Sequence, residues 1–174
     1  MTSATLQDSG RRIARAQRLE EQCFEVLGGF VTSTADAEVK LLLARQSHHH
    51  AWHAELFARV LPDANGFDPG PVDPDPGVVA FLDLLAATTG PIDRLAGVFD
   101  LWIPRKVAAY ERWLDETDPV RDAPLVRWLQ FVVADERADL AEGRALLAAR
   151  APGAPTPGRV ALAAALDRVG DLLD

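Results

Sequence analysis

The stretch from Val39 to Val60 constrains this chain most, because it combines a helical apolar stripe with all four histidines of the protein. At 100° per residue its apolar side chains share one face, which is typical of a helix packed on a core. That face consists of Val39, Leu42, Leu43, Leu56, Phe57 and Val60. Gln46, His50 and His53 fall inside the stripe, His49 lies at its edge, and His48 points the opposite way. The core must therefore take in imidazole and amide groups, and each needs a partner, since an unpaired buried polar group costs about 1–3 kcal/mol.

Length and composition predict one globular domain spanning residues 1–174. A chain of 174 residues with 48% hydrophobic and 25% charged residues can build a core of its own. The net charge of −8 argues against a nucleic-acid binder, which would carry a basic face. The single cysteine, Cys23, excludes an intrachain disulfide and a zinc site built from several cysteines.

The chain also lacks the patterns of secreted and membrane proteins. Its first ten residues are polar and contain no apolar signal core. No apolar run approaches the roughly 20 residues that a membrane span needs. We therefore expect a cytoplasmic protein that does not bind a membrane.

Periodicity predicts long helices at about 7–31, from the 33–34 region to Leu61, at 91–116 and at 123–150. Thr34 or Ser33 is the expected N-cap of the second of these. The proline- and glycine-rich segment 62–77 cannot be helical and is expected to cross the bundle surface. A short helix is expected at 78–88, a kink at Pro104, a linker at 152–158 and a last amphipathic helix at about 160–173.

These elements contain no strand pattern, so the predicted class is all-α, with four long helices and a long second connection. The crossover carries aspartates that invite a calcium interpretation. Their spacing does not match an EF-hand loop, and we expect solvated carboxylates instead. The residues concerned are Asp63, Asp68, Asp73 and Asp75.

Each long helix carries polar residues at core-facing positions. The set comprises Glu20 in the first helix, Gln46, His50, His53 and His49 in the second, Lys106 and Tyr110 in the third, and Glu136 and Asp139 in the fourth. With a rise of about 1.5 Å per residue, every member falls in the middle third of its helix. A shared height is what one common site requires.

Carboxylates combined with imidazoles suit a transition metal such as iron, manganese or zinc. His50 and His53 are three residues apart and therefore project from one helix face, as do Glu136 and Asp139. The alternative is a buried ion-pair network in which Lys106 pairs with Glu136 or Asp139 and the histidines pair with Glu20.

This arrangement resembles the ferritin-like superfamily over about residues 7 to 150. Its di-iron members supply one Glu from the first helix, Glu-x-x-His from the second, one Glu from the third and Glu-x-x-His from the fourth. Glu20 matches the first position. His49 or His53 matches the second-helix histidine, although Gln46 and His50 stand where Glu is expected. In the fourth helix Glu136 is followed by Asp139 in place of His, and the third offers Lys106 and Tyr110 at the height of the acid.

The leading hypothesis is a metal-dependent oxidoreductase or oxygenase that acts on a small organic molecule. Iron is the first choice of metal, with manganese or zinc as alternatives, and the resemblance implies one or two ions. The proposed ligands are Glu20, His49, His50, His53, Glu136 and Asp139, with Gln46 as an alternate. His50 and His53 are also the candidate catalytic residues, with Tyr110 and Lys106 orienting the substrate.

Two alternatives remain open at this point. One is a metal-free helical enzyme in which His50 or His53 acts as a general base held by Glu20 or Glu136. The other is a non-catalytic binding module whose polar core is structural. In that case Trp52 and the C-terminal helix are expected to support a homodimer surface.

Overall fold

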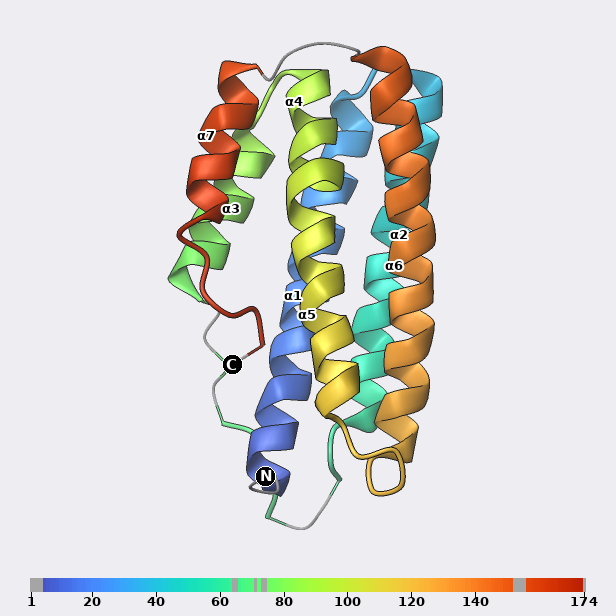
Figure 1. The fold of residues 1–174 in the computed structure, drawn as a ribbon, viewed down its shortest axis with the longest axis vertical. Helices are drawn as coiled ribbons and strands as arrows, with labels where there is room; N and C mark the ends of the chain where they lie inside the picture. The colour runs from blue at the N-terminus through green and yellow to red at the C-terminus, as the bar shows by residue number, and fades with distance from the viewer. Residues whose placement is uncertain (1–4, 64–65, 71, 73–74, 152–155, 174) are drawn as a thin grey trace.

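The computed structural model describes residues 5–63, 66–70, 72, 75–151 and 156–173, and in these residues every regular element is a helix. Four long rods form the bundle in Figure 1. They are α1 (Leu6–Ser33), α2 (Ala37–Val60), the continuous rod α4 (Pro91–Ala96), η1 (Gly97–Trp102) and α5 (Ile103–Glu116), and α6 (Ala123–Arg150). Two shorter helices, α3 (Pro76–Ala87) and α7 (Pro157–Leu166), pack together beside the bundle. The predicted all-α class is confirmed.

The long connection after α2 sets the direction of the later rods. In Figure 1, α2 runs antiparallel to α1, and the chain then returns along the bundle through the crossover and α3. The rod α4–η1–α5 consequently runs in the same direction as α2, and α6 runs back beside both. Asp73 in the expected crossover and residues 152–155 of the expected linker lie outside the described residues.

The turn between α1 and α2 corrects one prediction. The N-cap of α2 is Asp36, whose carboxylate accepts the backbone N–H groups of Glu38 and Val39 at 3.0 and 3.1 Å. Thr34 and Ser33, the predicted caps, instead donate their hydroxyls to the carbonyl of Phe30. Both hydroxyls thus bond the same carbonyl in the last turn of α1, which leaves the carboxylate to cap α2.

A π-helical turn precedes Pro104, where the sequence predicted a kink. η1 ends at Trp102, two residues before Pro104, and the N–H of Ile103 bonds to the carbonyl of Val98. In this register the carbonyl of Phe99 faces Pro104, which has no N–H to donate. Arg144 of α6 supplies the missing bond, from its Nε to that carbonyl at 3.2 Å. The wider turn accommodates the proline, and a neighbouring helix satisfies the carbonyl that it leaves free.

The C-terminal segment corrects a second prediction, because α7 ends at Leu166 rather than near residue 173. Beyond it the chain is non-helical, yet Val169, Leu172 and Leu173 are buried. Arg105 of α5 donates to the carbonyls of Val169 and Gly170 at 2.6 and 2.9 Å. These bonds replace those of a continued helix and hold the tail against the bundle.

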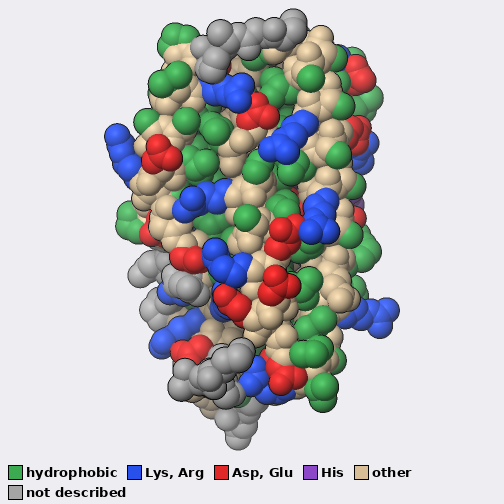
Figure 2. Space-filling view, in the orientation of Figure 1, with side chains coloured by type: hydrophobic (Ala, Val, Ile, Leu, Met, Phe, Trp, Pro, Cys, Tyr) green, Lys and Arg blue, Asp and Glu red, His purple; other side chains and the backbone are tan. Residues whose placement is uncertain are grey.

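The outer face of the bundle is charged. Figure 2 shows Lys and Arg interspersed with Asp and Glu over the visible face, with apolar side chains between them. In the described part of the chain, no helix is both long and apolar enough to cross a membrane.

Replacing Gly143 by alanine should destabilise the protein by about 1–3 kcal/mol, because a Cβ there would overlap the buried ring of Phe99. That loss outweighs the gain in helix propensity, which is at most about 1 kcal/mol. Gly29 in α1 is the matched control, since a Cβ there meets no atom within 4 Å, and its replacement should stabilise by about 0.5–1 kcal/mol. Urea denaturation of the two variants checks this, and equal effects would contradict the close packing of η1 on α6.

Candidate metal centre

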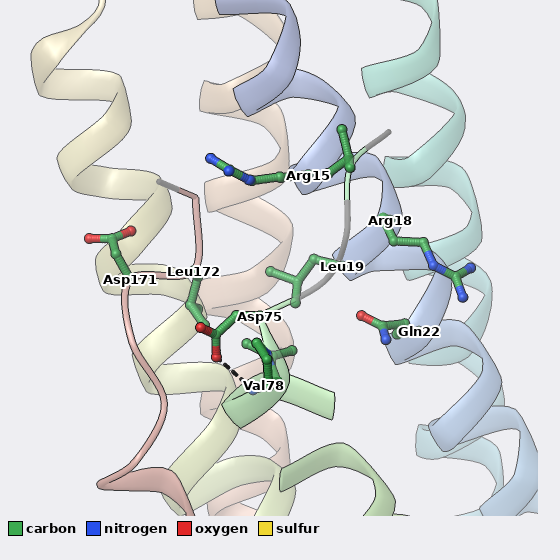
Figure 3. Close-up of a pocket in the computed structure, with 10 residues that line it drawn as sticks. Arg15, Arg18, Leu19, Gln22, Asp75, Val78, Asp171 and Leu172 are labelled. Atoms are coloured by element: carbon green, nitrogen blue, oxygen red, sulfur yellow. Dashed lines mark hydrogen bonds between the residues drawn. The ribbon is translucent and has the colours of Figure 1, made fainter. Parts of the chain in front are cut away.

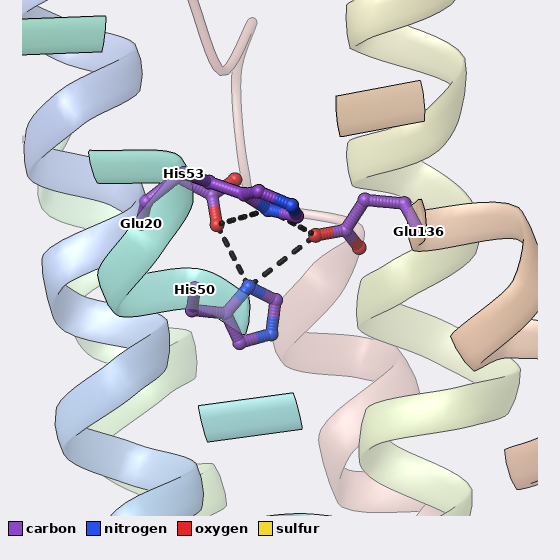
Figure 4. A group of neighbouring side chains, drawn as sticks. All are labelled: Glu20, His50, His53 and Glu136. Carbon is purple, nitrogen blue, oxygen red and sulfur yellow. Dashed lines mark hydrogen bonds and ion pairs between the residues drawn. The ribbon is translucent and has the colours of Figure 1, made fainter. Parts of the chain in front are cut away.

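Four side chains from three helices converge in the middle of the bundle. Glu20 comes from α1, His50 and His53 come from α2, and Glu136 comes from α6 (Figure 4). Each offers a ligand atom, and these atoms all lie within 4.8 Å of one another. All four side chains are at most 1% exposed. The predicted convergence of acids and imidazoles at one height is therefore present.

The close packing of α1 on α2 positions Glu20. Ser47 is buried at this interface and donates its hydroxyl to the carbonyl of Phe24 at 3.0 Å. Gly28 faces the same hydroxyl, and a Cβ at residue 28 would lie 3.1 Å from it. A small residue on each helix thus brings the two backbones close together. One turn further along, the carboxylate of Glu20 meets the ring of His50.

The two imidazoles both face the two carboxylates. Nδ1 of His50 lies 2.7 Å from Oε2 of Glu20 and 3.3 Å from Oε1 of Glu136. Nδ1 of His53 lies 3.6 and 3.4 Å from the same two oxygens. The rings themselves are nearly perpendicular, at 78°. The four groups therefore enclose one small polar volume, as Figure 4 shows.

Lys106 and Tyr110 of α5 enter the same cluster. Nζ of Lys106 lies 3.0 and 3.1 Å from the two oxygens of Glu20 and 2.7 Å from Oε1 of Glu136. It also lies 3.0 Å from Nδ1 of His50. The hydroxyl of Tyr110 donates to Oε1 of Glu20 at 2.5 Å. Both residues were expected near the site, and both touch a carboxylate of the cluster directly.

Charge pairing overrides burial at the carboxylates. Burial alone would raise the pKa of Glu20 and Glu136, but the charges of Lys106 and His50 hold both pKa values well below the ordinary range. Both groups are therefore ionised, and their two negative charges need two positive charges in a site closed to solvent. Lys106 supplies one, and its pKa is raised because both carboxylates outweigh its burial.

The imidazoles respond in the opposite sense. Burial alone would lower the pKa of His53, but its contacts with Glu136 and Glu20 raise that pKa to about 10. The pKa of His50 is also raised, because the same two carboxylates outweigh burial and the charge of Lys106. Without a metal ion, a proton on this histidine pair supplies the second positive charge.

Asp139, predicted as a ligand, lies instead at the edge of the cluster. Its Oδ2 is 2.8 Å from Nδ1 of His49, and its backbone carbonyl accepts the side-chain amide of Gln46 at 3.2 Å. Burial raises the pKa of the Asp139 carboxyl. The structure thus groups these three predicted residues as a neighbouring set, separate from the four convergent ligands. His48 is exposed, as expected.

Sequence reasoning missed Asp135 as a neighbour of the site. Its Oδ2 lies 3.4 Å from Nε2 of His53, and its side chain is 28% exposed. His53 therefore lies between the buried carboxylates and a carboxylate that reaches solvent. The apolar pattern of α6 gave no signal for this, because Asp135 lies beside the core-facing stripe rather than on it.

The cluster has the donor chemistry of a transition-metal site. Two carboxylates and two imidazoles suit a borderline divalent ion. Among the described residues, Nε2 of His50, Nδ1 of His53 and Oε2 of Glu136 are buried without a hydrogen-bond partner. Buried polar atoms are normally paired, and the unpartnered Nδ1 of His53 faces both carboxylates, so this set of donors could hold an ion.

The centre is separate from the surface cavities. One cavity of about 270 Å³ lies between α1, the start of α3 and the C-terminal tail. Figure 3 shows that it is lined by Arg15, Arg18, Leu19, Gln22, Asp75, Val78, Asp171 and Leu172. Leu19 precedes Glu20 in α1, but Glu20 itself faces the bundle interior. This cavity does not open onto the imidazoles.

Comparison of the chain with protein-family models, curated proteins and solved structures found no match.

Proposed function

We propose that this protein is a metal-dependent oxidoreductase whose centre is one transition-metal ion held by Glu20, His50, His53 and Glu136. The observation that carries the proposal is the enclosure of four ligand atoms within 4.8 Å, with three of the ligands holding unpaired buried atoms. Iron is the proposed metal, with manganese or zinc as alternatives, because all three bind carboxylate and imidazole ligands.

We propose further that the bundle is of the ferritin-like type. Its second connection is long, so α2 and the α4–η1–α5 rod share one direction (Figure 1). Its candidate ligands lie at mid-height on α1, α2 and α6, as in the carboxylate-bridged bundles. The departure is on α5, where Lys106 reaches the position that an acid would take. A single ion fits this ligand set better than two ions do.

A bound iron or manganese ion would supply one-electron chemistry toward dioxygen or a similar oxidant. The protein's own groups would hold the ligands and exclude water. The bond from Tyr110 fixes the orientation of Glu20. His53 and the partly exposed Asp135 are placed to move a proton between the centre and solvent. Because the imidazoles are fully enclosed, the reactant must be very small, or α2 and α6 must part to admit an organic substrate.

A metal-free centre is the second candidate, and one observation favours it. Nζ of Lys106 already contacts three of the four candidate ligand side chains at 2.7–3.1 Å. With a proton on the histidine pair, the network is neutral without an ion. A general base would need a cavity beside His50 or His53, whereas both rings are at most 1% exposed. The homodimer surface stays a prediction. Trp52 is 37% exposed, and the centroid of its ring lies 5.0 Å from that of Phe131.

Metal analysis tests the proposal. Protein loaded anaerobically with Fe²⁺ and freed of excess metal should retain about one equivalent per chain, and His53→Leu should lower this at least about tenfold. His48→Leu is the matched control, since His48 is exposed on the same helix, and it should retain the full equivalent. Less than about a tenth of an equivalent in the native protein would reject the metal centre in favour of the metal-free network.

A further inference from the structure

The position of Lys106 has a consequence for any ion that enters the centre. Its Nζ touches Oε2 of Glu20, Oε1 of Glu136 and Nδ1 of His50 at 3.1, 2.7 and 3.0 Å. These atoms bracket the volume that the candidate ligands enclose. Carboxylate and imidazole atoms bind a transition metal at about 2.0–2.2 Å, so a metal ion would lie among the same atoms.

An ammonium group and a divalent ion cannot share that volume. Both are positive, and the site excludes the solvent that would screen their repulsion. The carboxylate lone pairs toward which the ammonium directs its hydrogens are also those that would bind the ion. Lys106 is itself 0% exposed, so its charge is held in the centre by these contacts rather than by water.

We propose that Lys106 is a resident cation that competes with the metal ion, so that an ion binds only by displacing Nζ from Glu20, Glu136 and His50. This inference rests on the proposed metal centre and adds the residue that sets its affinity. The displaced side chain is flexible and has the ring of Tyr110 5.8 Å from its Nζ. A cation can remain near an aromatic face at this range.

Competition of this kind would make the centre selective. An ion must bind the ligands strongly enough to displace a buried ammonium that is paired with two carboxylates. Ions at the weak end of the divalent series, such as Mn²⁺, would therefore bind the native protein poorly compared with Fe²⁺. Without any ion, Lys106 keeps both carboxylates paired, so the protein can fold before it meets a metal.

The decisive variant is Lys106→Met, which keeps the length of the side chain and removes its charge. Mn²⁺ binding, measured by electron paramagnetic resonance of the free ion, should be at least about tenfold tighter than in the native protein, because no charged contacts are displaced. Arg105→Met removes one positive charge from the adjacent position of α5, outside the centre, and its affinity should stay within about threefold of native. The metal-free Lys106→Met protein should be less stable, and Mn²⁺ should raise its melting temperature.

The outcomes separate this inference from the metal centre itself. Equal affinities in the native and Lys106→Met proteins would overturn the competition and leave the centre intact. Binding in Lys106→Met alone would support the competition but reject a metal-dependent function of the native chain. Binding in neither would reject both. A Lys106→Met chain that stays unfolded with and without Mn²⁺ would also overturn the proposal, since the ion should replace the lost charge. In a crystal of the native protein loaded with Fe²⁺, Nζ should lie beyond about 4 Å from both carboxylates.

Discussion

Replacement of Glu20 by alanine should lower the free energy of unfolding by about 3–5 kcal/mol in metal-free protein. Glu20 accepts hydrogen bonds from Lys106, His50 and Tyr110, and all four side chains are at most 1% exposed. Removal of the carboxylate leaves a buried ammonium and a phenol hydroxyl without their principal partner. It also opens a cavity that the surrounding helices can fill only in part.

Urea denaturation followed by circular dichroism, with a chelator present, measures this loss. Glu21→Ala is the matched control, because Glu21 is the next residue of α1 and its side chain pairs with Arg18 at the surface. That variant should change stability by no more than about 1 kcal/mol. A loss below about 1 kcal/mol for Glu20→Ala would show that the central network contributes little to folding and that its residues need another explanation.

The convergence of the site could be read from the sequence because helix geometry is regular. Glu20, His50, His53 and Glu136 each fall on an apolar stripe, and a fixed rise per residue places them at one height. Periodicity does not say which of several core-facing groups touch. Asp139 shares the stripe of Glu136 but lies one turn further along α6, where it meets His49 instead.

Lys106 illustrates the limit of that reasoning. Its position on the core-facing stripe of α5 was evident, but its contact with three candidate ligand side chains depends on how its flexible side chain lies. Asp135 was missed for a different reason, since it lies to one side of the core-facing stripe of α6. Its contact with His53 shows that the edge of a helix interface can still reach the core.

The two corrected helix ends have different physical causes. Asp36, Thr34 and Ser33 are all residue types that can cap α2. Their side chains lie within four residues and can bond the nearby backbone N–H and carbonyl groups in several ways, so the sequence does not decide which of them is the cap. The end of α7 depends on Arg105 of a distant helix, which binds the carbonyls of the tail. Such long-range bonds leave no trace in the periodicity of the segment.

The second large effect expected is a loss of stability as the pH rises, in metal-free protein. The pKa of His53 is raised to about 10 from an ordinary value of 6.5, and that of His50 is raised as well. Between these values the folded protein holds a proton that the unfolded chain releases, so the folded state loses stability with rising pH. The contribution is complete below pH 6.5 and disappears as the pH passes about 10. One proton corresponds to about 1.4 kcal/mol per pH unit, or about 2–3 kcal/mol between pH 6.5 and 8.5.

The carboxylates act in the opposite direction. The pKa values of Glu20 and Glu136 are lowered from 4.5, so their contribution is complete above that pH and is lost in acid. These groups together should give the metal-free protein its greatest stability between about pH 4.5 and 6.5. Above pH 9, Cys23 and Tyr110 complicate the profile, because burial raises both of their pKa values in the folded protein. Urea denaturation at half-unit steps from pH 6 to 8.5 isolates the histidines.

Glu136→Gln is the variant that tests the origin of this slope. It keeps the shape of the side chain and removes one of the two negative charges, so Lys106 alone balances Glu20 and no imidazolium is needed. The decline between pH 6.5 and 8.5 should then fall to less than about a third of the native value. Glu142→Gln, on the exposed side of α6, removes a charge that pairs with Arg45 at the surface, and it should leave the slope unchanged. A flat native profile, or a full slope in Glu136→Gln, would mean that no proton on the histidine pair balances the second carboxylate.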